Sequence, residues 1–224
     1  MGIELRLLRL LQLVSPALPI GMYSYSQGLE RAIDDGWLRN EQDCYEWLQG
    51  VMWRAQAVTD VPYLKRLHSA WAEDDTAAAA WWSAELLACR ESRELRDEDR
   101  QTGQALAKLL VKLAIPEAQV WVRHSDTTLA TLFALAAVRW QLSVEETLAA
   151  YLWGWLENQV LAAVKLVPLG QVAGQQLLYR LAEDIPLSIA MALQLSDAEL
   201  GGSAWGQVLA SSRHEMQYSR LFRS

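Results

Sequence analysis

Side chains that could bind a metal or act as nucleophiles are few in this chain of 224 residues. Its histidines and cysteines are His68, His124, His214, Cys44 and Cys89. None has a second histidine or cysteine at the short spacing typical of metal sites, such as His-x-x-x-His or Cys-x-x-Cys. A metal site assembled from distant residues, which would make the protein a helical metalloenzyme, is therefore a minor alternative.

The motifs of nucleophilic and nucleotide chemistry are also missing from the sequence. It contains no Gly-x-Ser-x-Gly elbow, and neither cysteine stands beside a base. It contains no Gly-x-x-x-x-Gly-Lys phosphate loop, so the chain does not look like an NTPase. Asp97, Glu98 and Asp99 form a dense acidic run. Because Arg96 and Arg100 flank it, we expect a solvated surface charge cluster or turn there.

Composition indicates a packed globular protein of one large or two small domains, with 52% hydrophobic and 21% charged residues. The 11 tryptophans suit both a core and a large protein interface. The net charge of -7 argues against a nucleic-acid or anionic-membrane binder. Two cysteines make no disulfide framework, and the apolar stretch 5–14 is too short to cross a bilayer. We expect a cytoplasmic protein.

The segment from Ser143 to about Val167 has the clearest helical pattern. Ser143 and Glu146 form a capping-box pattern at its start, and Pro168 follows its end. Most positions around the helix are apolar or aromatic, so we expect a central helix surrounded by protein. The polar exceptions share one narrow sector, and they are Glu146, Thr147, Gly154, Glu157, Asn158 and Lys165. This sector predicts a thin solvated strip or, alternatively, a surface facing a partner or an internal channel.

Helical periodicity continues along the rest of the chain, with neither a strand pattern nor a repeat of fixed period. We therefore expect an all-α, single-domain bundle of about ten helices around the central helix, spanning residues 1–224. The expected helices are about 4–14, 24–34, 41–59, 63–72, 76–93, 101–113, from a cap at Ser125 or Asp126 to Trp140, 143–167, 171–183, 187–195 and 204–218. Gln159 lies in the apolar sector of the central helix, so it should have a hydrogen-bond partner there.

Three segments outside the regular helices suit contacts with other proteins. Residues 15–30 contain two prolines, which stiffen the chain, and hydroxyls from serine and tyrosine. A plain helix–helix connector is an equally good interpretation of that segment. Residues 166–171 join two helices. The C-terminal tail, about 212–224, gathers the aromatic and arginine side chains that usually anchor interfaces, so we interpret it as a docking peptide.

These three segments, in this order, resemble the signature segments of the UreF family of urease accessory proteins. The stretches concerned read SPALPIGMYSYSQGLE, WLENQVLAAVKLVPLGQVAGQQLL and HEMQYSRLFRS, and ELRDEDRQTGQAL stands where the family has a comparable charged segment. The resemblance covers essentially the whole chain. It implies an all-α, non-enzymatic chaperone for the nickel centre of urease, with no cofactor of its own because partner proteins handle nickel and GTP.

The resemblance also implies a set of partners. Members of the family dimerise and bind a second accessory protein, UreD, which is called UreH in some organisms. That pair recruits the nickel-carrying GTPase UreG, and the assembly acts on apo-urease. The family has been viewed as an activator or as a fidelity checkpoint of the GTPase, and a tunnel through the complex has been proposed as a nickel route.

Carried over residue by residue, the resemblance assigns partner contacts to the tail and to the first segment. These candidates are His214, Glu215, Tyr218, Arg220, Leu221 and Phe222, together with Tyr23, Gln27 and Glu30. Arg220, in the family's Arg-Leu-Phe pattern, is the best single candidate. Candidates for the GTPase face or the tunnel lining are Glu157, Asn158, Lys165 and Gln171. We expect Lys165 to form a salt bridge, with Glu157 or with another helix, rather than to act on bound GTP.

Two alternatives of other classes stay open at this point. A helical metalloenzyme using His68, His124 or His214 predicts tightly held metal in the purified protein. A structural dimer that only solubilises its partner predicts that changes at Glu157 or Lys165 leave urease activation unaltered.

Overall fold

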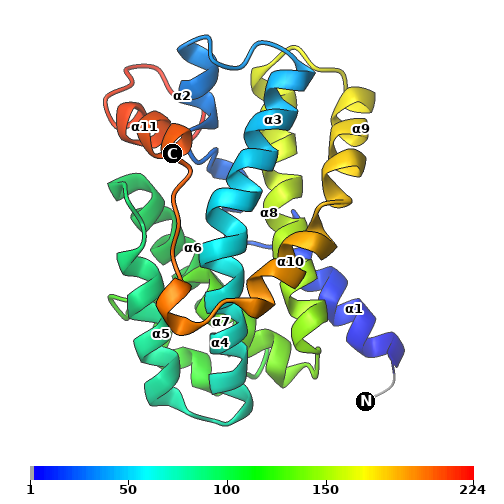
Figure 1. The fold of residues 1–224 in the computed structure, drawn as a ribbon. Helices are drawn as coiled ribbons and strands as arrows, with labels where there is room; N and C mark the ends of the chain where they lie inside the picture. Colours follow the sequence, from blue (N-terminus) through cyan, green and yellow to red (C-terminus); the bar gives the residue numbers. More distant parts are fainter. Residues whose placement is uncertain (1–2) are drawn as a thin grey trace.

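The computed structural model describes residues 3–224, in which helices alternate with loops and no strand occurs. The α-helices are α1 Ile3–Val14, α2 Leu29–Asp34, α3 Glu41–Val51, α4 Val61–Ala72, α5 Thr76–Ala88, α6 Arg93–Lys112, α7 Leu129–Arg139, α8 Val144–Leu166, α9 Gln171–Ala182, α10 Ile185–Gln194 and α11 Trp205–His214. Short 3-10 helices are η1 Met22–Ser24, η3 Pro116–Val122 and η4 Asp197–Glu199. Figure 1 shows one bundle with α8 passing through its middle. The predicted all-α class is confirmed.

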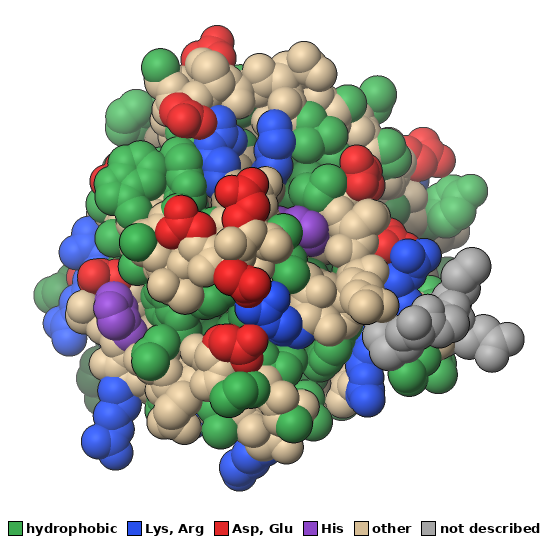
Figure 2. Space-filling view, turned by 90° about the horizontal axis from the view of Figure 1, so that it is seen from below, with side chains coloured by type: hydrophobic (Ala, Val, Ile, Leu, Met, Phe, Trp, Pro, Cys, Tyr) green, Lys and Arg blue, Asp and Glu red, His purple; other side chains and the backbone are tan. Residues whose placement is uncertain are grey.

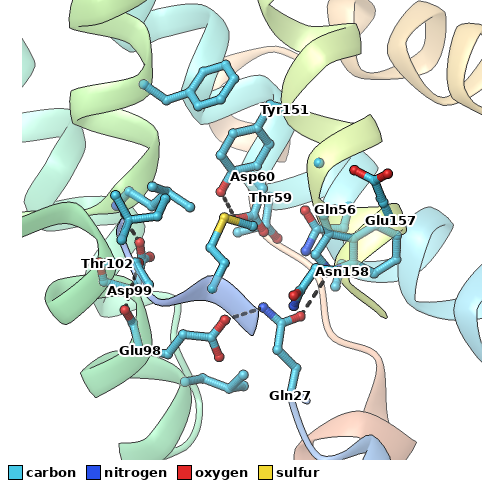
Figure 3. A pocket seen from close by; sticks show the side chains of 18 of the residues that line it. Gln27, Gln56, Thr59, Asp60, Glu98, Asp99, Thr102, Tyr151, Glu157 and Asn158 are labelled. Carbon is cyan, nitrogen blue, oxygen red and sulfur yellow. Dashed lines mark hydrogen bonds between the residues drawn. The ribbon is translucent and has the colours of Figure 1, made fainter. Parts of the chain in front are cut away.

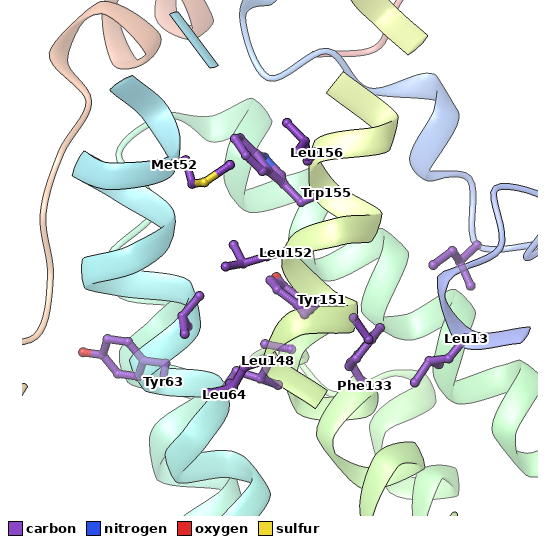
Figure 4. Close-up of a cluster of buried hydrophobic side chains, with 14 of the residues drawn as sticks. Leu13, Met52, Tyr63, Leu64, Phe133, Leu148, Tyr151, Leu152, Trp155 and Leu156 are labelled. Carbon is purple, nitrogen blue, oxygen red and sulfur yellow. The ribbon is translucent and has the colours of Figure 1, made fainter. Parts of the chain in front are cut away.

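Helix α8 is the predicted central helix, and its ends are where the capping residues place them. The Ser143 hydroxyl accepts from the Glu146 amide, and the Glu146 carboxylate accepts from the Ser143 amide at 2.8 Å. The helix packs against α1, α2, α3, α4, α7, α9 and α10. Figure 4 shows its Leu148, Leu152 and Leu156, all fully buried, in the hydrophobic core. Because other helices surround it, α8 contributes side chains to the interior on several of its faces.

The prediction that Thr147 belongs to a solvated strip of α8 is wrong. This residue is fully buried, and its hydroxyl donates to the Ser143 carbonyl at 2.7 Å. The bond to its own helix satisfies the hydroxyl, so threonine can stand in the core. Gln159 is also buried, but its Nε2 has no hydrogen-bond partner among residues 3–224, contrary to the expectation of a partner there.

The column formed by α3 and α4 contains a π-helix, Met52–Asp60. The Val61 amide donates to the carbonyl of Gln56, five residues back, instead of four. The sequence predicted a break between helices 41–59 and 63–72, yet Pro62 lies in the first turn of α4, which directly follows the π-helix. Gln56 and Asp60 thereby face the interior and are buried.

Helix α6 corrects the expectation of a solvated charge cluster at residues 95–100. Ser92 caps the helix by accepting from the Leu95 amide, so the charged run lies in its first turns. Glu98 and Asp99 are buried, whereas Arg96 is exposed. The run is therefore amphipathic at helical spacing, with acidic side chains on the buried face.

Other predicted boundaries also shift for local reasons. The expected helix at 24–34 begins only at Leu29, because Gln27 and Gly28 both have positive φ, 54° and 85°. The helix expected at 76–93 ends at Ala88, and Thr128 rather than Ser125 or Asp126 caps α7. The last helix, expected to reach residue 218, ends at His214, after which the tail turns back onto the bundle.

Gly103 of α6 packs directly on the turn before α7. A Cβ at this position would lie 2.6 Å from the carbonyl carbon and oxygen of Thr128. Gly154 of α8 is a matched contrast, since a Cβ there meets no atom within 4 Å. Gly103→Ala should lower the free energy of unfolding by about 1–3 kcal/mol through overpacking. Gly154→Ala should raise it by up to about 1 kcal/mol through helix propensity. Urea unfolding of both variants tests this pair, and equal effects would contradict the close packing at Gly103.

Candidate functional site

A polar cavity lies beside α8, between the loop after α1, the π-helix and α6 (Figure 3). Its volume is about 90 Å³, which is room for several water molecules. Apolar side chains of the loop after α1, among them Leu18 and Ile20, form part of the wall. The polar part of the lining includes Gln27, Gln56, Asp60, Glu98, Asp99, Glu157 and Asn158. We call this space the polar cavity.

A buried ion cluster forms one wall of the polar cavity. The Arg90 guanidinium donates to both carboxylate oxygens of Asp60, at 2.6 and 3.1 Å, and to Asp99 at 2.8 Å. The Tyr151 hydroxyl adds a bond to Asp60, and the Leu129 amide adds one to Asp99. Burial raises the pKa of Asp99, although Arg90 opposes the shift. The cluster joins the π-helix, α6, α7 and α8 at one point.

Glu98 of α6, next to Asp99 in the lining, is held by two donors. Gln27 Nε2 donates to its Oε1 at 2.9 Å, and the Ser224 hydroxyl donates to its Oε2 at 3.1 Å. Burial raises the pKa of this carboxyl to about 7. Gln27 in turn accepts from the Trp155 indole at 2.9 Å. Through Glu98, the cavity lining therefore touches the last residue of the sequence.

Two further polar groups in the cavity lining lack an ion-pair or hydrogen-bond partner within residues 3–224. The half-buried Glu157 carboxyl forms no ion pair within the described residues, and burial raises its pKa. Gln56 Oε1 is buried and accepts no hydrogen bond within residues 3–224. The carboxyl groups of the lining number five, against the one guanidinium of Arg90, and they belong to Asp60, Glu91, Glu98, Asp99 and Glu157. This lining suits a hydrated cation better than an anion.

The tail, residues 215–224, is packed on the bundle beside α2 and α6. The Glu30 carboxylate accepts from the backbone amides of Leu221 and Phe222, at 2.7 and 2.9 Å. The Ser26 amide donates to the Ser224 carbonyl at 2.7 Å. Arg220 donates to Glu94 at 2.9 Å and to the Glu215 and Gln217 carbonyls. Backbone and side-chain bonds thus fix the path of the tail.

The tail has a buried side and an exposed side. Phe222 and Ser224 are buried, with exposed fractions of 6% and 0%. Met216, Tyr218 and Leu221 are largely exposed, the last two by 104% and 67%. The docked tail therefore presents apolar and aromatic side chains to solvent while its backbone is held in place.

The residues proposed for partner contact separate into these two groups. Glu30, His214 and Phe222 are buried under or within the docked tail, and the Glu215 carboxylate accepts from the Arg93 amide. Tyr23 on η1 is exposed, whereas Gln27 is directed into the cavity (Figure 3). Direct partner contact by the buried residues would require the tail to move, so their assigned role stays a prediction.

The candidates for the GTPase face or the tunnel lining also separate into two groups, inside and outside the polar cavity. Glu157 and Asn158 line the polar cavity, and Asn158 donates to the Tyr25 carbonyl at 3.2 Å. Gln171 is exposed at the start of α9. The expected salt bridge of Lys165 is wrong within the described residues: its ammonium lies over the Phe222 ring, 5.7 Å from the centroid. Eight residues along an α-helix span about 12 Å, too far for a pair with Glu157.

Sequence reasoning missed several residues that build this site. Asp60 and Arg90 were not singled out, because ion partners 30 residues apart leave no spacing signal. Glu94 and Glu98 were seen only as part of a charged run. The signal that could have found them is the spacing of Leu95, Glu98, Asp99 and Thr102, which share one helix face with Leu106.

The remaining histidines have separate structural partners. His68 of α4 lies 3.2 Å from the Leu142 carbonyl, and His124 Nδ1 accepts from the Asp126 amide. No cluster of three or more His, Cys, Asp or Glu side chains arranged to hold a metal ion occurs in the part of the chain that the structure describes. In the same residues, every helix is too short or too polar to cross a membrane.

Comparisons with known proteins agree with one another. A family model described as UreF matches residues 38–182. The urease accessory protein UreF of Alkalilimnicola ehrlichii is 56% identical over 216 residues, which cover 96% of this chain and 95% of that protein. Those of Teredinibacter turnerae and Hahella chejuensis are 47% and 45% identical, each over 98% of this chain and 99% of the relative.

The raised pKa of Glu98 predicts a pH-dependent stability. Because folding raises this pKa from 4.5 to about 7, the wild-type free energy of unfolding should fall as pH rises through that window. Glu98→Gln removes the ionisation, so the variant should gain on the order of 2 kcal/mol relative to wild type between about pH 5 and pH 8. Urea unfolding at both pH values measures this gain. Glu73→Gln, at an exposed position outside the cavity lining, is the control, and an equal gain there would contradict the assignment to Glu98.

Proposed function

Because the chain belongs to the UreF family of urease accessory proteins, we propose that it is a non-enzymatic scaffold of urease maturation. In this proposal it binds a UreD/UreH-type accessory protein and recruits a UreG-type GTPase to apo-urease in the cytoplasm. Nickel and GTP are handled by those partners. The observation that supports this proposal best is the docked tail, which holds exposed side chains in a fixed arrangement.

The tail has the properties of a preorganised binding segment. Tyr218 and Leu221 are exposed, and tyrosine is one of the residue types enriched among those that dominate binding energies at interfaces. Their backbone is already fixed by Glu30 and Arg220. A segment that is ordered before binding loses less conformational entropy when the partner docks.

The wider surface is compatible with protein partners rather than nucleic acid. On the face seen in Figure 2, basic side chains stand apart and acidic ones lie among them. Nucleic-acid binders instead gather Lys and Arg into a patch or stripe. The net charge of -7 points in the same direction.

The polar cavity is the part of the chain that fits a cation route. We propose that Glu157 and Asn158 belong to the lining of such a route, with nickel as cargo rather than as a resident cofactor. Five carboxyl groups around one guanidinium favour a hydrated cation over an anion. Lys165 and Gln171 are not part of the cavity lining, so they remain candidates for the GTPase face.

The proposal includes a homodimer, for which α1 offers a surface. This helix extends away from the bundle in Figure 1. Its exposed leucines are Leu5, Leu7, Leu8 and Leu11, with 42% to 60% of their surface accessible. Contiguous leucines on an extended helix form the kind of apolar face that homodimers bury.

The partner proposal is tested by co-expression with UreD- and UreG-type proteins followed by co-purification. Arg220→Ala removes the bonds to Glu94 and to two tail carbonyls, so the ternary complex should be lost. Tyr218→Ala with Leu221→Ala leaves those bonds in place, and should weaken the complex about 30-fold or more if these are hot spots. The exposed Val120→Ala of η3 is the matched control. Wild-type binding by both tail variants would overturn the role of the tail.

The dimer proposal has its own measurement. Leu8→Arg with Leu11→Arg places two charges on the leucine face and should yield monomers of 25.2 kDa by light scattering. Val120→Arg, which charges another exposed apolar position, should remain dimeric. An unchanged mass for the α1 variant would place the interface elsewhere.

A further inference from the structure

His214 lies at the point where the tail leaves α11, and its ring is buried between two carboxylates. Its Nδ1 is 2.8 Å from Glu94 Oε2, and its Nε2 is 3.3 Å from Glu30 Oε2. The side chain has an exposed fraction of 0%. Each nitrogen of the imidazole therefore faces an acceptor, with no room for solvent to intervene.

This arrangement specifies the charge state of the ring. A neutral imidazole carries one N–H, whereas an imidazolium carries two and can donate in both directions. An ionised carboxylate only accepts hydrogen bonds. In neutral His214, one nitrogen lone pair would point at a carboxylate oxygen, which is a repulsive contact in a buried site. The geometry thus requires the imidazolium as long as Glu30 and Glu94 stay ionised.

The same two carboxylates bind the tail. Glu30 accepts from the Leu221 and Phe222 amides, and Glu94 accepts from Arg220. His214 thus connects α2 and α6 through the groups that hold residues 220–222. Loss of its charge would leave the Glu30 carboxylate without a cationic partner among residues 3–224 and would leave Glu94 paired with Arg220 alone.

The charged groups around the ring come from each element packed on it. Glu30 belongs to α2, Glu94 to α6 and Arg220 to the tail. On α11 itself, Arg213 pairs with Asp35. The other neighbour, Glu215, accepts from the Arg93 amide. The ring is therefore opposed by two carboxylates, and within residues 3–224 Arg220 is the one other cation paired with either of them, through Glu94.

We propose that protonated His214 is a pH-sensitive clasp that holds residues 217–224 on the bundle, and that loss of its proton releases them. The inference concerns this chain alone and goes beyond the proposed function. Its failure would leave that proposal intact, because no partner takes part in the test. If the tail also binds a partner, the clasp makes that binding vary with pH.

The direction of the pH effect follows from linkage. Burial alone would lower the pKa of His214, but Glu94 and Glu30 outweigh it, and the net pKa is raised. Docking is therefore supported in full below about pH 6.5, the ordinary histidine value. This support is lost as pH rises through the raised pKa, with the docking equilibrium weakening by about tenfold per pH unit in that window.

Hydrogen exchange of the tail amides measures the docking equilibrium directly. We would follow residues 217–224 by mass spectrometry at about pH 6 and about pH 9, correcting for the intrinsic pH dependence of exchange. Glu98→Gln serves as the background, because Glu98 contacts Ser224 and titrates nearby. Protection should fall by about tenfold per pH unit between about pH 6.5 and the raised pKa of His214, and should level off above that pKa. In His214→Gln it should be low and independent of pH.

Two results would overturn the clasp. One is protection that does not change with pH when His214 is present, and the other is the same pH dependence in His214→Gln. A second measurement does not depend on how that variant folds. The chain has 3 histidines, so ring nitrogen signals of the Glu98→Gln protein can be titrated by NMR with His68 and His124 as internal references. A doubly protonated His214 with a midpoint above about 6.5 supports the clasp, and a midpoint at or below that value contradicts it.

Discussion

The rest of the structure depends on the bonds that Arg90 makes to Asp60 and Asp99. A guanidinium and two carboxylates leave water together, which is tolerable only when every charge keeps its partners. The three residues come from the π-helix, from the loop before α6 and from α6 itself, and Tyr151 adds α8. The cluster therefore fixes the distance between helices that would otherwise close over the polar cavity. Apolar packing alone would favour the collapse of such a space.

Gln27 and Glu98 extend this polar interior to the surface. Gln27 adopts a left-handed backbone conformation that is uncommon for a residue with a side chain. Its amide meets Glu98 on one side and the Trp155 indole on the other. Because Glu98 also accepts from Ser224, the cavity wall and the end of the tail share one carboxyl group. The position of the tail and the shape of the cavity lining are therefore linked through Glu98, and the Ser26 amide adds a second link to Ser224.

Much of the fold could be predicted from local patterns, and most of the site could not. The limits of α8 followed from Ser143, Glu146 and Pro168, since capping and breaking act within a few residues. The interior position of Glu98 did not follow, because an alternating charged run is usually solvated and only the packing of α6 decides which face is buried. The partners of Arg90 lie 9 and 30 residues away in sequence, and His214 meets residues 120 and 184 positions earlier. Contacts at such separations leave no periodic trace in one sequence.

The π-helix between α3 and α4 has a consequence for the register of the whole column. Each residue of an α-helix turns the chain by about 100°, so one added or missing residue rotates everything beyond it by that angle. In Met52–Asp60, backbone amides donate to carbonyls five residues back, whereas the helices on either side have the ordinary spacing of four. Deleting one residue here would let the segment relax to ordinary α geometry, but it would remove the wider turns that direct Gln56 and Asp60 into the interior. The nine-residue π-helix thus changes the rotation of the chain between α3 and α4. It lets one continuous helical column pack on α7 at one end and direct polar side chains into the interior at the other.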